Sequence, residues 1–140
     1  RGFAHFTPFL LSLQAGACLR LQKLKDGMDA LIAARAIVQG GCDLYWEAEL
    51  YRLQGELLRA LGTDNESTER YFRLGLETAH QQRARMLELR GAVSLAHLWQ
   101  DQDQSRAAQQ VLGEAYDKFT EGFDTLDLQE ASALLQQIAG

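Results

Sequence analysis

Apolar residues recur along this chain at intervals of three and four, which is the spacing of one face of an α-helix. The clearest stripe consists of Leu50, Leu53, Leu57, Leu58 and Leu61. Similar stripes follow one another along the chain, separated by short polar or glycine-containing runs. No segment shows the alternation of apolar and polar residues that is typical of a half-buried β-strand. The pattern predicts an all-α protein made of amphipathic helices joined by short turns.

Polar and glycine-containing runs indicate where the predicted helices end. The breaks fall at Lys25-Asp26-Gly27, at Gly40-Gly41, at Gly62, at Gln81-Gln82, and at residues 101–104 and 120–125. Thr63 and Glu66 have the spacing of a capping box, which predicts that a helix begins beside them. The breaks divide the chain into three helical pairs and one last helix. The pairs cover about residues 7–39, 44–82 and 84–119, and the last helix covers about residues 125–138.

A repeated arrangement of small and bulky residues links the three pairs. In each pair a small residue near the middle of the first helix is followed three residues later by a bulky one, and the second helix continues with small, bulky and small residues. The arrangement starts at Cys18, Gly55 and Ala96. Small side chains let neighbouring helices approach to about 8–10 Å. The repetition therefore predicts stacked helical pairs, with these three residues buried where helices meet.

This arrangement resembles the tetratricopeptide repeat, although the repeat is longer here and the closing proline is missing. Two strings, residues 47–58 (EAELYRLQGELL) and 116–131 (YDKFTEGFDTLDLQEA), are similar to the C-terminal helical-repeat region of large bacterial regulators. Those regulators join a class III adenylate or guanylate cyclase domain, or another output domain, to a signal-transducing P-loop ATPase and then to the repeats. The resemblance implies a right-handed superhelix of three tetratricopeptide-like hairpins with a C-terminal capping helix.

A length of 140 residues suits a single domain over residues 1–140. The same resemblance implies a regulatory, partner-sensing role. The sequence starts at Arg1 and shows no signal-peptide pattern, so we expect a fragment of a larger protein. Two cysteines are too few for a disulfide scaffold, which favours a reducing, cytoplasmic location. Cys18 is expected to be a buried structural thiol. Cys42 lies in a linker, where exposure without a function is favoured over reactivity.

Composition narrows the range of partners. Fourteen Lys and Arg against 19 Asp and Glu give a net charge of −5, so the chain lacks the positive field that usually attracts nucleic acids. No apolar run approaches the roughly 20 residues that a membrane-spanning helix needs. We therefore expect a protein or peptide partner and neither a nucleic acid nor a membrane.

Residue patterns that would indicate catalysis are weak. The lysines, Lys23, Lys25 and Lys118, do not follow a glycine, so the P-loop of the resembled ATPases is not in this chain. Glu77 and His80 have the Glu-x-x-His spacing of di-iron bundles, but that site needs a second copy, and a solvated helix end is favoured. We expect a non-enzymatic chain without catalytic residues, cofactor or metal.

The first helices of successive pairs line the concave face of such an array, where peptides usually bind. Projection from the small-residue positions places seven polar side chains on that face: Glu49, Arg52, Glu56, Arg59, Arg90, His97 and Gln100. Because a guanidinium can hold a carboxylate with two bonds, we expect the three arginines to form a mixed-charge groove for an acidic segment. That segment belongs to a partner or to the parent's own upstream domains. A solvated face with ion pairs of Glu56 with Arg52 or Arg59 explains the same pattern equally well.

Two alternatives to this reading stay open. One is a small all-helical ligand-binding or enzymatic domain with an interior pocket, and the other is a purely structural spacer. A further expectation concerns the N-terminal aromatic cluster of Phe3, Phe6, Phe9 and Leu10. In an intact parent these side chains would pack on a preceding repeat, so in the fragment they are expected to fold back or to mediate self-association.

Overall fold

The computed structural model describes residues 13–20, 23–39 and 44–140. Its elements are a helical segment over residues 13–20, α2 (Leu24–Gln39), a short 3₁₀ turn η1 (Leu44–Trp46), α3 (Glu47–Ala60), α4 (Asn65–Gln81), α5 (Arg85–Asp101), α6 (Ser105–Tyr116) and α7 (Leu126–Ala139). None of the described residues forms a β-strand. The prediction of an all-α protein is therefore confirmed.

Most of the predicted helix ends are also confirmed. Gly62 follows α3 with φ of +76°, a backbone conformation that glycine adopts at little energetic cost. The breaks predicted at Gln81-Gln82 and at 101–104 separate α4 from α5 and α5 from α6. The turn predicted at 120–125 lies between α6 and α7. The break predicted at Gly40-Gly41 lies outside the described residues.

The break predicted at Lys25-Asp26-Gly27 is wrong, because these residues form the first turn of α2, which begins at Leu24. Gly27 is buried inside this helix. A Cβ atom at Gly27 would lie 3.2 Å from the Cβ atom of Cys18 and 3.2 Å from a methyl carbon of Leu57. The glycine therefore allows close packing of three segments and does not end a helix.

The capping box predicted from Thr63 and Glu66 is also wrong. The N-cap of α4 is Asp64, whose Oδ1 atom accepts a hydrogen bond from the backbone N–H of Ser67 at 2.8 Å. This bond is the main reason why the pKa of Asp64 lies below its usual value. A carboxylate placed three residues before a free amide satisfies that amide without help from a residue at the capping-box position.

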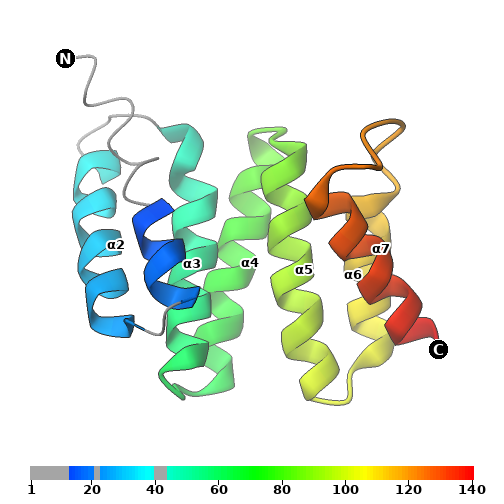
Figure 1. Cartoon of the computed structure of the whole chain (residues 1–140), viewed down its shortest axis with the longest axis horizontal. Coiled ribbons are helices and arrows are strands. Elements are labelled where there is room, and N and C mark those ends of the chain that lie inside the picture. Colours follow the sequence, from blue (N-terminus) through cyan, green and yellow to red (C-terminus); the bar gives the residue numbers. More distant parts are fainter. Residues whose placement is uncertain (1–12, 21–22, 40–43) are drawn as a thin grey trace.

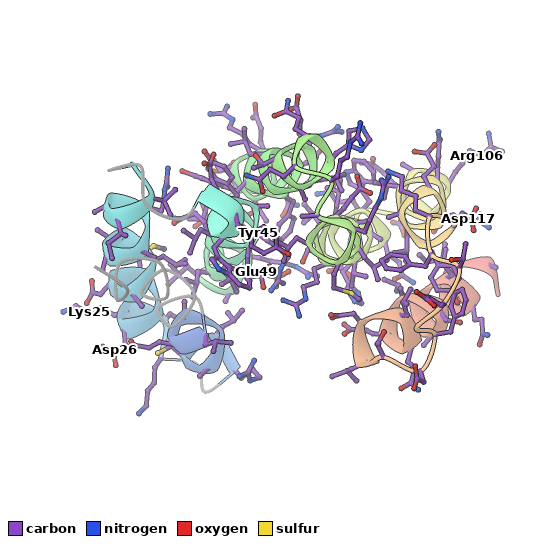
Figure 2. All side chains as sticks on the ribbon, turned by 90° about the horizontal axis from the view of Figure 1, so that it is seen from above. Lys25, Asp26, Tyr45, Glu49, Arg106 and Asp117 are labelled. Carbon is purple, nitrogen blue, oxygen red and sulfur yellow. The ribbon has the colours of Figure 1, made fainter. Side chains whose placement is uncertain are left out.

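Helices α2 to α6 lie side by side in a row, as Figure 1 shows, and short turns join α3 to α4, α4 to α5 and α5 to α6. Sequential neighbours α3 and α4, α4 and α5, and α5 and α6 pack together. In addition α3 contacts α5, and α5 contacts α7, so alternate helices form an inner layer. Viewed from above in Figure 2, the segment 13–20 (blue) and α7 (red) project to the same side of this row. The row therefore curves around a space in front of α3 and α5.

Small residues set the distances between these helices, as predicted. Cys18, Gly55 and Ala96 are all buried. A Cβ atom at Gly55 would lie 2.5 Å from the ring of the fully buried Phe72, and one at Gly75 would lie 2.9 Å from the backbone oxygen of Ala48. Helices α3 and α4 therefore pack with little room for side chains between them. The buried apolar residues form clusters along the row, the largest of which joins α4, α5, α6 and α7.

Candidate peptide-binding groove

A groove of about 440 Å³ opens on the inner side of the row. Helices α3 and α5 form its floor, and the segment 13–20 and α7 form its two sides. Figure 2 places Glu49 on the side of α3 that borders this space. The described residues that line the groove are Leu13, Gly16, Leu19, Arg20, Trp46, Glu49, Arg52, Leu53, Glu56, Arg59, Leu89, Arg90, Val93, Ser94, His97, Asp127 and Glu130.

The structure brings together most of the residues that the repeat pattern placed on a concave face. Six of those seven line the groove: Glu49, Arg52, Glu56, Arg59, Arg90 and His97. Gln100, which lies one turn further along α5, is half-buried and does not line the groove. The projection from small-residue positions therefore selects side chains that share one concave surface.

Glu49 is the central charged group of the groove and is only 7% exposed. Its two carboxylate oxygens accept hydrogen bonds from Nε and Nη2 of Arg52 at 2.7 and 3.0 Å. Nη1 of Arg90 donates a third bond to Glu49 at 3.1 Å. Burial by itself lowers the pKa of Arg52, but the hydrogen bond to Glu49 and the negative charges of the nearby carboxylates together outweigh it and raise that pKa above the usual value. The buried carboxylate is thus held by two cations.

The same arginines connect three helices of the inner layer. Nε of Arg90 donates to Oδ2 of Asp127 on α7 at 3.0 Å, so Arg90 links α3, α5 and α7. Nη1 of Arg52 donates to the buried Ser94 hydroxyl on α5 at 3.3 Å. These bonds fix the orientation of the two guanidinium groups.

The ion pairs expected between Glu56 and Arg52 or Arg59 are wrong. Arg52 pairs with Glu49, and Arg59 on α3 pairs with Asp101 at the end of α5. All three arginines expected to hold a partner's carboxylate therefore already hold carboxylates of this chain. Within the described part of the chain, Glu56 and Glu130 form no ion pair.

Several residues that line the groove were not predicted from the sequence. Asp127 and Glu130 lie three residues apart, which places them on one face of a helix, but nothing local shows that this face of α7 borders the groove. Ser94 is likewise a buried hydroxyl whose partner, Arg52, is 42 residues away. Only the packing of α7 and α5 against α3 brings these groups together.

A second hollow of about 370 Å³ lies on the other side of the row and contains another buried carboxylate. Glu88 is 3% exposed and bonds to Nδ1 of His80 and Nζ of Lys118, each at 2.7 Å. Burial alone raises the pKa of Glu88, but the bonds and charges of Lys118 and His80 outweigh it and hold that pKa below the usual value. The exposed His80 therefore interacts with the buried carboxylate of Glu88, eight residues further along the chain.

Other predicted features can be placed only in part. Cys18 is a buried free thiol, as expected. Cys42 and the aromatic cluster of Phe3, Phe6, Phe9 and Leu10 lie outside the described residues. In the described ranges, no group of three or more His, Cys, Asp or Glu side chains could hold a metal ion. None of the helices in those ranges has both the length and the apolar character needed to cross a membrane.

Comparisons with protein-family models, with curated proteins and with solved structures find no match to this chain.

Proposed function

We propose that this chain is a non-catalytic protein-interaction module with a tetratricopeptide-like superhelical arrangement, which binds a segment of a partner protein in its groove. One observation carries the proposal. Six residues chosen from the repeat pattern alone line a single groove whose floor and one side come from the alternate helices α3, α5 and α7. Peptides bind helical-repeat arrays on the surface that such alternate helices form.

The character of the groove supports a peptide over a small apolar ligand. Ten of its seventeen described lining residues are polar or charged, whereas pockets for small molecules are lined mainly by apolar side chains. Exposed apolar surface is present as well, since Leu13 is 53% exposed at one side of the groove. The volume also falls in the range of small-molecule pockets, so a ligand-binding domain is the alternative.

The resemblance of residues 47–58 and 116–131 to the repeat region of bacterial cyclase and ATPase regulators supports a regulatory setting for this module. In that setting the bound segment belongs to an upstream domain of the same parent or to a separate signalling partner. The module would then signal that the partner is bound, and other domains of the parent would carry out catalysis.

A displayed library of random twelve-residue peptides tests the proposal. Peptides selected on the whole chain are titrated against the wild type and against two variants that each add one indole ring. His97→Trp fills the groove floor, where His97 is half-buried, and Gln109→Trp adds the same ring at an exposed position of α6 outside the groove. We expect His97→Trp to raise the Kd of selected peptides at least about tenfold.

Gln109→Trp serves as the matched control and should leave the Kd unchanged. Circular dichroism on both variants shows whether each keeps its helical content. The proposal is wrong if no peptide is enriched, or if folded His97→Trp and Gln109→Trp bind every selected peptide as the wild type does.

A further inference from the structure

We infer that the groove selects a segment that presents basic side chains to Glu56 or Glu130, and that it does not select an acidic segment. The inference rests on the proposed function, because it specifies the chemistry of the segment bound in the same groove. It replaces the acidic occupant expected from the three arginines of the sequence pattern.

The pairing of charges in the groove leads to this reversal. Four arginines and four carboxylates line the groove. Arg52 and Arg90 together balance Glu49 and Asp127, and Arg59 is balanced by Asp101 beside the groove. Glu56 acts on Arg52 only at longer range. Of the four carboxylates that line the groove, Glu56 on α3 and Glu130 on α7 are the two that form no ion pair with a described residue.

The exposure of these two glutamates in the groove suits basic groups of a bound segment. Glu56 is half-buried on α3, Glu130 is exposed on α7, and both line the same groove over α5. A carboxylate that is partly removed from water attracts a cation more strongly than a fully solvated one. The net charge of −5 adds a long-range attraction for a basic segment.

Binding of an acidic segment in the groove is disfavoured. To bind Arg52 or Arg90, its carboxylate would have to compete with Glu49 or Asp127, which already hold these guanidinium groups by hydrogen bonds of 2.7 to 3.1 Å. If Glu49 were displaced, it would lose its partner without gaining contact with water, because it is almost completely buried. Arg20, on the opposite side of the groove, is the lining cation that forms no ion pair among the described residues. It can orient the segment by contacting a carbonyl or a carboxylate away from the glutamates.

The groove also favours apolar residues next to the basic one. Leu13 and Leu19 lie on the segment 13–20, and Val93 lies on the floor, so the aliphatic stem of Lys or Arg and its apolar neighbours find a surface to cover. The favoured occupant is therefore a short segment with one or two basic residues among apolar ones.

The composition of the selected peptides and a charge-neutralising variant test this inference. We expect selection on the wild type to enrich Lys and Arg over the unselected library and to deplete Asp and Glu. The double variant Glu56→Gln with Glu130→Gln, which removes two charges with little change of shape, should raise the Kd of these peptides about five- to twentyfold. Raising the salt concentration should weaken binding to the wild type more than to the variant.

The control is Glu66→Gln with Glu121→Gln, which removes the same charge from exposed positions outside the groove. Its effect on Kd should stay within about twofold. Enrichment of acidic peptides, no excess of basic ones, or equal effects of the two double variants would each overturn the inference. The proposed function would survive those outcomes as long as His97→Trp still blocks binding, whereas failure to select any groove-binding peptide overturns the proposed function itself.

Discussion

Two glutamates, Glu49 and Glu88, are almost completely buried, and each is held by at least two basic side chains. Arg52 and Arg90 bond to Glu49, and His80 and Lys118 bond to Glu88. A carboxylate removed from water is tolerated only with such compensation. At the scale of single residues, the basic groups around these glutamates therefore stabilise the fold, whether or not they also bind a partner.

The effect of Glu88 on stability should depend on pH. Its pKa is lower in the folded chain than in the unfolded chain, so the ionised group stabilises the fold above the ordinary glutamate pKa of about 4.3. That contribution is lost as the pH falls through the lowered folded-state pKa. At pH 7 we expect Glu88→Gln to reduce the free energy of unfolding by about 1–3 kcal/mol.

Urea unfolding at pH 7, 5, 4 and 3 measures this prediction. The difference between wild type and Glu88→Gln should shrink on acidification below about pH 4. Glu121→Gln, at an exposed turn position, should change stability little at any of these values. A difference that is constant over the series would show that Glu88 acts through its shape and not through its charge.

At the scale of helices, glycine has two distinct uses in this chain. Gly62 and Gly122 have positive φ and lie in turns. Gly55 and Gly75 lie inside α3 and α4, where glycine costs about 1 kcal/mol relative to alanine in helix propensity. The close approach of the two helices explains why the smaller residue is present there.

Replacing Gly75 by alanine should therefore destabilise the chain although it improves helix propensity. The new Cβ atom would lie 2.9 Å from the oxygen of Ala48 and 3.3 Å from the nitrogen of Arg52. Both are backbone atoms of α3 and cannot move without shifting the helix, so we expect a loss of about 1–3 kcal/mol in unfolding free energy.

Gly113→Ala in α6 is the matched control, because apart from its chain neighbours and the backbone of its own helix nothing lies within 4 Å of the added carbon. It should stabilise the chain by up to about 1 kcal/mol. Urea titrations followed by circular dichroism compare the two variants. Equal effects of the same sign would contradict the view that interhelical distance requires glycine at position 75.

At the scale of the whole molecule, the groove exists because α7 is held beside the inner layer. Leu128, Ala131 and Leu134 bury the apolar face of α7 against the preceding helices. Arg90 adds polar bonds across α3, α5 and α7. The position of α7 therefore sets the width of the groove on that side.

Arg90→Met should loosen α7 without unfolding the chain, because methionine keeps the apolar stem and removes the bonds to Asp127 and Glu49. Hydrogen exchange of the α7 backbone amides should become about tenfold faster, while α5 keeps its protection. Arg106→Met, at an exposed position of α6 marked in Figure 2, is the control and should leave α7 unchanged. Uniformly faster exchange in Arg90→Met would indicate a global loss of stability instead.

Self-association through Phe3, Phe6, Phe9 and Leu10 also belongs to this scale and stays a prediction. Sedimentation of the chain measures it directly. A monomer in which these phenylalanines are exposed to solvent would contradict both the folded-back form and the self-associated form.

Local features could be predicted where a short stretch of sequence decides them. The helices, the turn at Gly62 and the burial of Cys18, Gly55 and Ala96 follow from spacing and side-chain size within one or two turns. The interpretation of Gly27 failed because a glycine that permits close packing and a glycine that ends a helix look the same in sequence. What distinguishes them is the nearby presence of Cys18 and Leu57.

The amino-acid sequence by itself determined that the described chain is helical and where most helices end, because helix periodicity and propensity act between residues a few positions apart. Only the tertiary structure decided which charges meet in the groove. Arg90 bonds to Glu49, 41 residues away, and to Asp127, 37 residues away. These residues meet only because whole helices pack against one another. Side-chain pairing between helices depends on their separation and rotation, which no local pattern encodes.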